Sequence, residues 1–137
     1  MKRSATAVWH GSGKEGSGHL STVNKVLDQT KYSWHSRFEH APGTNPEELL
    51  AAAHAGCFSM KLSFVLGHSG VTPEEINTTC EVTLENGAIT QSHLTVKVKA
   101  TGITQEKFDH AIKEAKETCP ISKSITANVT AEAVLES

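Results

Sequence analysis

The feature that most constrains the fold is a long apolar segment that runs from about Pro46 to about Gly67. Its apolar residues cover nearly every side of a helix, so in a soluble protein it is expected to form a buried central helix. Asn45 is a good N-cap, and Pro46 suits the first helical turn. Glu47 and Glu48 follow, where negative charge matches the positive end of the helix dipole. The helix therefore has a defined start.

Strand patterns precede this helix. Residues 4–10, 19–23 and 31–39 have the β-branched and alternating character of short strands. The glycine-rich residues 11–18 predict a hairpin loop between the first two. Arg37 in the third strand is expected on the face opposite the aromatic side chains, because side chains alternate along a strand. An N-terminal β-sheet is therefore predicted.

A hairpin, a second helix and a last strand follow the central helix. Asn86-Gly87 has the residues that a two-residue type I′ hairpin turn requires. The apolar stripe of the second helix continues to Cys119, where Pro120 interrupts it, so Cys119 should face the core at a helix end. The predicted elements are a strand over 76–84, a strand over 94–100, a helix capped by Thr104, and a strand over 127–135.

This order of elements is an α+β arrangement without a repeated βαβ rhythm. A length of 137 residues lies within the range of one domain, so we expect a single folding unit over residues 1–137. An apolar helix this long needs more cover than about forty N-terminal residues of thin sheet can supply. We therefore expect an intertwined homodimer.

Composition excludes several classes of protein. Thirteen basic and fifteen acidic residues give a net charge of -2, which leaves no broad positive field for nucleic acid. The first residues lack the sustained apolar run of a signal peptide, and an apolar fraction of 37% is that of a soluble protein. We therefore expect a cytoplasmic protein with neither a nucleic-acid nor a membrane partner.

Three cysteines carry the candidate chemistry. Their odd number and wide spacing argue against a secreted disulfide framework and against a four-cysteine zinc site. Cys57 lies among alanines and a glycine, so another molecule could approach its sulfur closely, although an inert core thiol is the commoner role. Both roles are open for Cys119 as well. Cys80 lies on the apolar face of its strand and is expected in the core, dispensable for chemistry.

His54 offers an alternative use of the same helix. It lies three residues before Cys57 on one helix face and could supply half of a metal site. Together with Cys119 and His68, these residues define a metal-binding hypothesis, which predicts stoichiometric zinc in purified protein. The ligand spacing is poor, and a histidine satisfied within the core is the commoner case.

Three stretches carry a resemblance to a known family. They are Arg37-Phe38-Glu39, the run from Gly43 to Met60 that reads GTNPEELLAAAHAGCFSM, and Cys119-Pro120-Ile121-Ser122. In these stretches the chain resembles the osmotically inducible protein C branch of the OsmC/Ohr family, and its element order fits that family's fold over essentially the whole chain. In the organic hydroperoxide resistance branch the arginine comes from an earlier loop, so the place of Arg37 is that of the OsmC branch.

The resemblance implies a thiol-dependent hydroperoxide reductase. Cys57 would be the peroxidatic thiol and Cys119 the resolving thiol, with Arg37 and Glu47 completing the site and no cofactor or metal. A thiol attacks only as thiolate, and a guanidinium lowers its pKa and stabilises charge on the breaking O–O bond. A bidentate carboxylate would hold that guanidinium in place.

In the implied cycle, Cys57 becomes a sulfenic acid with which Cys119 condenses to form a disulfide. An external dithiol then reduces the disulfide, and the resemblance implies a dihydrolipoyl group rather than thioredoxin. Apolar neighbours in the helix favour organic hydroperoxides over hydrogen peroxide; they are Phe58, Met60 and Phe64. The alternative is a redox-responsive stress protein whose disulfide changes its shape without turnover.

Helix length bears on how the site is assembled. Ten residues of straight helix place Glu47 about 15 Å along the axis from Cys57, too far for one Arg37 side chain to bridge comfortably. We therefore expect Arg37 and Glu47 of one subunit to meet Cys57 and Cys119 of the other.

Overall fold

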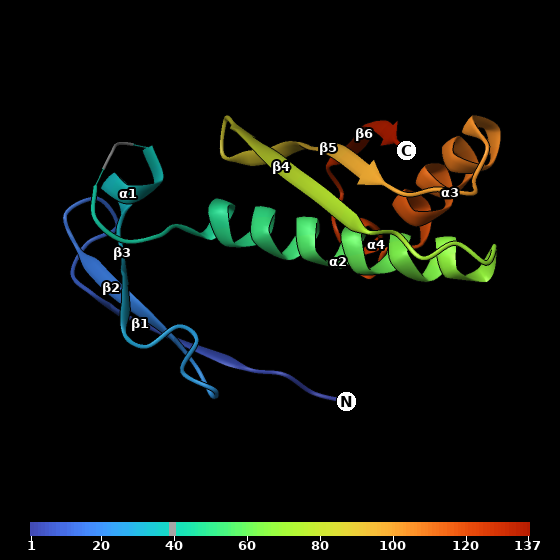
Figure 1. Cartoon of the computed structure of the whole chain (residues 1–137). Coiled ribbons are helices and arrows are strands. Elements are labelled where there is room, and N and C mark those ends of the chain that lie inside the picture. Colours follow the sequence, from blue (N-terminus) through green and yellow to red (C-terminus); the bar gives the residue numbers. More distant parts are fainter. Residues whose placement is uncertain (39–40) are drawn as a thin grey trace. The chain divides into compact units, whose positions relative to one another are not determined.

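The computed structural model describes residues 1–38 and 41–137, and the chain divides into two compact units, Met1–Leu49 and Leu50–Ser137 (Figure 1). Each unit is described by itself. Glu39, the last residue of the predicted third strand and of the Arg37-Phe38-Glu39 stretch, lies outside the described residues. The single domain over residues 1–137 stays a prediction.

The first unit contains an antiparallel three-stranded sheet, as predicted from the N-terminal strand patterns. Its order is β1-β2-β3, so consecutive strands are hydrogen-bonded neighbours. The hairpin between the first two strands closes with a hydrogen bond from the Gly16 N–H to the Ser12 carbonyl, 2.8 Å long. The strands are β1 (Ala5–His10), β2 (Ser17–Thr22) and β3 (Thr30–Tyr32).

The third predicted strand is wrong beyond Tyr32, because the chain turns there into a short helix, α1 (Trp34–Phe38). The Ser36 N–H donates to the Ser33 hydroxyl at 3.1 Å, and the Ser33 N–H donates to the Ser36 hydroxyl at 2.8 Å. This reciprocal capping satisfies backbone donors that a strand would otherwise pair. Arg37 therefore sits on a helix, with its guanidinium carbon 5.9 Å from the centre of the Phe38 ring. The expectation that it points away from the aromatic side chains is wrong.

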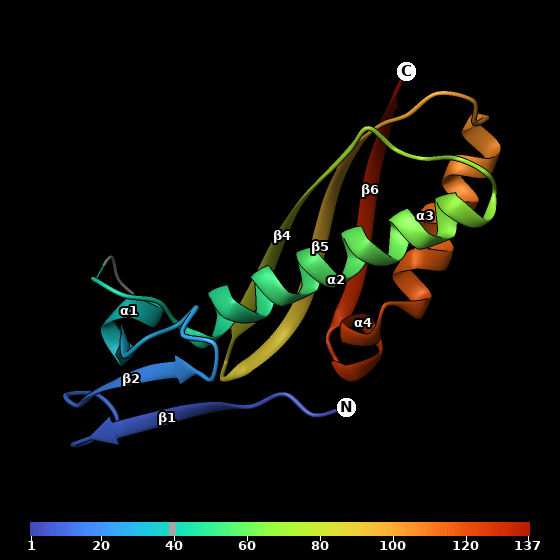
Figure 2. The same cartoon turned by 60° about the horizontal axis from the view of Figure 1, so that its bottom comes forward.

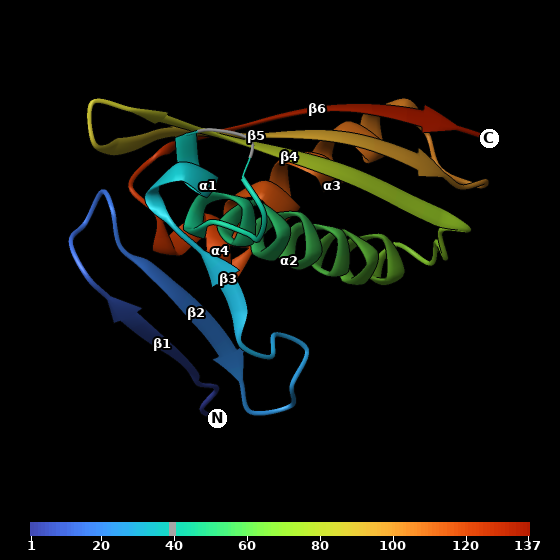
Figure 3. The same ribbon diagram turned by 90° about the vertical axis from the view of Figure 1, so that its left-hand side faces the viewer.

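The second unit is a three-stranded sheet with two long helices, α2 and α3, on one face (Figures 2 and 3). β4 and β5 form an antiparallel hairpin, and β6 adds parallel to β5 after the helical crossover through α3 and α4. These elements confirm the predicted α+β order. The bounds are α2 (Pro46–His68), β4 (Glu75–Glu85), β5 (Ala88–Lys99), α3 (Gln105–Thr118), α4 (Pro120–Ser124) and β6 (Asn128–Glu136).

Local signals in the second unit are confirmed residue by residue. Asn86 and Gly87 join β4 to β5 with φ values of 49° and 77°, the left-handed conformations that a type I′ turn requires. The Thr104 hydroxyl accepts a 3.2 Å hydrogen bond from the Lys107 N–H and so caps α3. Pro120 ends α3 as predicted, and it also opens the short α4, which the sequence pattern did not indicate.

The hydrophobic core of the second unit lies between the sheet and one face of α2. Phe58, Leu62 and Leu66 are fully buried on that face, whereas Met60 and Phe64 are 65% and 62% exposed in the single chain. The expected burial of this helix therefore holds for one face only. By length and composition α2 is also apolar enough to cross a membrane, a test that core helices of soluble proteins pass as well.

Phe58→Ala should lower the free energy of unfolding by about 3–5 kcal/mol, because it removes a fully buried ring and leaves a cavity. Urea denaturation followed by circular dichroism measures this loss. Val134→Ala is the control, since that side chain is 58% exposed, and it should change the free energy by less than about 1 kcal/mol. Equal losses in the two variants would contradict the assigned core.

Candidate active site

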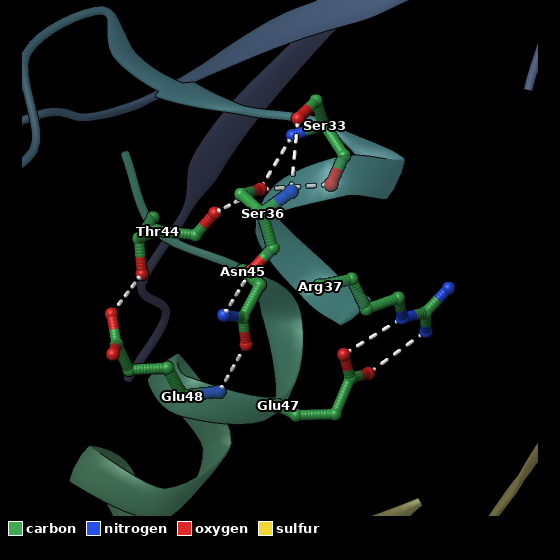
Figure 4. Close-up of polar contacts among 7 residues, drawn as sticks. All are labelled: Ser33, Ser36, Arg37, Thr44, Asn45, Glu47 and Glu48. Carbon is green, nitrogen blue, oxygen red and sulfur yellow. Dashed lines mark hydrogen bonds and ion pairs between the residues drawn. The ribbon is translucent and has the colours of Figure 1, made fainter. Parts of the chain in front are cut away.

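Arg37 and Glu47 form a two-pronged ion pair within the first unit (Figure 4). The guanidinium donates from Nε to Oε1 of Glu47 at 2.7 Å and from Nη2 to Oε2 at 2.8 Å. The Glu47 side chain is only 13% exposed, while that of Arg37 is 39% exposed. The hydrogen bonds to Arg37 hold the pKa of Glu47 below its ordinary value, and the same bonds raise the pKa of Arg37. The pair presents a fixed, permanently charged guanidinium.

The start of α2 is tied to α1 by a second set of polar contacts, also drawn in Figure 4. Asn45 caps α2 by accepting from the Glu48 N–H at 2.8 Å, and its amide donates to the Ser36 carbonyl at 2.8 Å. The Ser36 hydroxyl in turn donates to the carbonyl of Thr44, also at 2.8 Å. One residue, Asn45, therefore orients both elements that carry the Arg37–Glu47 pair.

Gly43 has to be glycine for this junction to form. Its φ of +103° is a left-handed conformation, and a Cβ there would lie 2.1 Å from the carbonyl oxygen of Lys31. The close approach lets the Thr44 N–H donate to that same carbonyl at 2.9 Å. The Gly-Thr-Asn-Pro-Glu motif thus builds the turn, the cap and the ion pair in five consecutive positions.

Cys57 and Cys119 meet in the second unit. Their sulfur atoms lie 2.9 Å apart, although the residues are 62 positions apart in the sequence. Cys119 is fully buried at the C-terminal end of α3, and Cys57 is partly buried on α2. Both cysteines are free thiols in the structure.

The electrostatic surroundings of Cys57 favour the neutral thiol. Burial is the largest influence and raises the pKa of Cys57, and the hydrogen bond with Cys119 raises it further. A backbone hydrogen bond from Ile121 and the charge of Lys61 act in the opposite direction but do not overcome the burial. The thiol therefore needs a stronger positive charge to become a thiolate at neutral pH.

A buried polar network beside the thiols was not predicted in detail from the sequence. His54 is fully buried, with Nδ1 2.6 Å from the Ser92 hydroxyl and Nε2 2.7 Å from the Ser122 hydroxyl. This confirms the prediction of a satisfied core histidine. Cys80 lies against the core as predicted, and its sulfur is 3.1 Å from the Ser92 hydroxyl. The partners of His54 lie on other elements, so no local pattern could indicate them.

The metal-binding hypothesis finds no geometric support. Among residues 1–38 and 41–137, no group of three or more His, Cys, Asp or Glu side chains is arranged to hold a metal ion. Both ring nitrogens of His54 are engaged by serine hydroxyls, so His54 could bind a metal only after giving up one of these contacts.

Comparisons with known proteins place similar sequences over most or all of the chain. A family model described as OsmC-like protein matches residues 39–134. The peroxiredoxin OsmC of Escherichia coli strain K12 is 44% identical over 141 residues, which cover 100% of this chain and 99% of that protein. The organic hydroperoxide resistance protein OhrB of Bacillus subtilis is 32% identical over 117 residues, 82% of this chain and 84% of that protein.

Solved structures show the same fold. The crystal structure of Bacillus subtilis OhrB matches with a TM-score of 0.65 at 26% identity, covering 97% of this chain and 98% of that one. An OsmC-like protein from Mycoplasma pneumoniae matches with a TM-score of 0.79 at 12% identity, covering 100% and 99% of the two chains. The second likeness bears on the fold alone.

The Arg37–Glu47 pair should be visible in a carboxyl titration. We expect the Glu47 carboxyl to titrate below its ordinary range, and Arg37→Met should move its pKa back upward. Because the folded-state pKa is depressed, the pair stabilises the fold above the ordinary carboxyl range and loses this effect as the pH falls through the folded-state pKa. NMR of side-chain-labelled glutamate measures the titration. Arg3→Met, at the chain's other arginine, should leave it unchanged.

Proposed function

The chain belongs to the OsmC-like protein family, and we propose that it reduces organic hydroperoxides by a two-cysteine cycle in which Cys57 attacks and Cys119 resolves. It is a cysteine-based peroxidase, and its relatives include a protein named peroxiredoxin OsmC and one named organic hydroperoxide resistance protein-like 1. The 2.9 Å contact between the two sulfur atoms is the observation that carries the proposal, because it allows a disulfide to form with little movement.

The first step is attack by the Cys57 thiolate on one oxygen of the hydroperoxide. The O–O bond breaks, the sulfur becomes a sulfenic acid, and the alkoxide leaves and takes a proton from water to give the alcohol. Arg37 is proposed to lower the pKa of the thiol and to stabilise charge on the leaving oxygen. Glu47 orients the guanidinium and does not react.

The surroundings of Arg37 favour a substrate with an apolar group. A cavity of about 230 Å³ within the first unit is lined in part by Arg37. Three aromatic side chains line it with Arg37; they are Trp9, Tyr32 and Trp34. We propose that this cavity holds the hydrocarbon part of the hydroperoxide. Phe58, which the sequence suggested as an apolar neighbour of the substrate, is fully buried in the core and serves packing instead.

The disulfide has to be reduced before the next turnover. We propose a dithiol of the dihydrolipoyl type, either free or on a lipoylated protein, because a dithiol can reduce a disulfide by two successive exchanges. A cytoplasmic location, where reduced dithiols are maintained, is part of the same proposal.

We propose further that the protein works as an intertwined homodimer in which Arg37 and Glu47 of one subunit serve the thiols of the other. On α2, Glu47 and Cys57 are separated by about 15 Å along the helix axis. The first unit contributes no buried hydrophobic side chain among the described residues, so a partner would supply the cover that it lacks. The exposed Met60 and Phe64 offer an apolar face of α2 for the same partner.

Catalytic turnover is the first test. With cumene hydroperoxide and dihydrolipoamide, reduced protein should consume peroxide over many cycles and show a Cys57–Cys119 link by mass spectrometry. Cys57→Ser should abolish consumption, and Cys119→Ser should leave a sulfenic acid that no internal thiol resolves. Cys80→Ser is the control and should keep activity within about twofold.

The outcomes separate the candidate functions. One oxidation event without repeated consumption would favour the redox-responsive stress protein. Free thiols together with undiminished peroxide would overturn the enzyme proposal altogether.

Mixing inactive variants tests the shared site. Arg37→Ala should lower peroxidase activity by about 100-fold and shift its pH dependence upward, because the buried thiol loses its cation. When equal amounts of Arg37→Ala and Cys57→Ser proteins are unfolded together and refolded, the mixture should regain about a quarter of wild-type activity, since about half of the dimers are mixed and one of the two sites in each mixed dimer is intact. No recovery in a mixture that does contain mixed dimers would place Arg37 and Cys57 of one site on the same chain.

A further inference from the structure

His54 occupies a place in the structure that the proposed cycle does not use. It is a fully buried, titratable side chain on α2, one helical turn before Cys57. Its Nε2 lies 2.7 Å from the hydroxyl of Ser122 on α4, and its Nδ1 lies 2.6 Å from the hydroxyl of Ser92 on β5. The ring therefore joins α2 both to the sheet and to the segment that follows Cys119.

The contact with Ser122 runs beside the contact between the thiols. His54 precedes Cys57 by three residues, and Ser122 follows Cys119 by three residues. Two contacts thus connect the same two segments, one between sulfur atoms at 2.9 Å and one between the ring and a hydroxyl at 2.7 Å. A second fixed point restricts how the Cys119 segment can move relative to α2.

We propose that His54 is a positioning residue for the resolving step, and that its hydrogen bond to Ser122 keeps Cys119 within reach of oxidised Cys57. This inference rests on the proposed two-cysteine cycle. In that step the S–O bond of the Cys57 sulfenic acid breaks, a bond forms between the two sulfurs, and the hydroxyl leaves as water with the proton of the Cys119 thiol. Hydroperoxide is the oxidant that supplied the sulfenic acid.

The chemistry of the ring suits this role. Burial lowers the pKa of His54 and so favours the neutral imidazole, which has one donor and one acceptor nitrogen. Ser92 and Ser122 can each act as donor or acceptor, so both nitrogens are satisfied in either tautomer. Ser92 is itself fully buried and also contacts the Cys80 sulfur at 3.1 Å, which anchors the sheet side of the network.

Two substitutions at His54 each keep one of its two serine contacts and remove the other. The side-chain amide of asparagine ends near the position of Nδ1, whereas that of glutamine reaches the position of Nε2. His54→Asn should therefore keep the contact with Ser92 and lose the contact with Ser122, and His54→Gln should do the reverse. Ser122→Ala removes the proposed positioning contact from the other side and leaves the imidazole in place. Ser59→Ala is the matched control, because the Ser59 hydroxyl ties α2 to Thr78 on β4 at 2.7 Å.

The experiment separates attack from resolution. Full-length reduced protein is mixed with one equivalent of cumene hydroperoxide, quenched at intervals and analysed by intact mass for sulfenic acid, trapped with dimedone, and for the Cys57–Cys119 disulfide. His54→Asn and Ser122→Ala should form the sulfenic acid at close to the wild-type rate but the disulfide about tenfold more slowly. More sulfinic acid should accumulate in both under excess peroxide. His54→Gln and Ser59→Ala should resolve at close to the wild-type rate.

Each other outcome is decisive. Disulfide formation at the wild-type rate in Ser122→Ala overturns the positioning role. So does an equal slowing of attack and resolution in both His54 variants, since that pattern indicates a general structural role. If wild-type protein itself forms sulfenic acid but no Cys57–Cys119 disulfide, the proposed cycle fails and the positioning role fails with it. A normal wild-type disulfide with unaffected variants defeats the inference about His54 alone.

Discussion

The thiol pair depends on the packing of α2 and α3 on one face of the β4–β5–β6 sheet. Phe58 is fully buried there and directly follows Cys57, so the core fixes the turn of α2 that carries Cys57. Cys119 is itself fully buried at the end of α3. Because both segments are held by the same core, the two sulfurs meet at 2.9 Å across 62 positions of sequence. Close packing leaves little freedom for either helix and so holds the two sulfur atoms in contact.

The same burial creates an electrostatic problem. It raises the pKa of Cys57, and the nearby Lys61 and the Ile121 backbone only partly offset it. We propose that Arg37 offsets this effect. It lies in the first unit, where Glu47 holds its guanidinium with two hydrogen bonds. A fixed guanidinium loses little freedom when it meets an anion, which suits it to a buried thiolate and to the charge on a breaking O–O bond. The packed thiol pair and the fixed guanidinium thus belong to different units of the chain.

Local sequence signals predict the structure correctly where no other signal competes with them. The Asn45 cap, the Asn86-Gly87 turn and the Thr104 cap each depend on neighbouring residues only, and the structure confirms them. The alternating side chains around Arg37 predict a strand, whereas two serines three residues apart cap a helix there instead. Serines at that spacing were the available signal. The alternating side chains favour a strand and the two serines favour a helix. The choice between them depends on which backbone groups find hydrogen-bond partners, and the sequence does not show this.

The sequence by itself determined the order and type of nearly all elements, the start of α2 and membership of the OsmC-like family, and it singled out Cys57, Cys119, Arg37 and Glu47 as the candidate site residues. Those properties depend on neighbouring residues or on a continuous motif. The tertiary structure alone decided that Cys57 and Cys119 touch, that burial raises the pKa of Cys57, and that His54 joins Ser92 to Ser122. The partners in these contacts lie 38 to 68 positions apart, and only the packing of helices on a sheet brings such distant residues together.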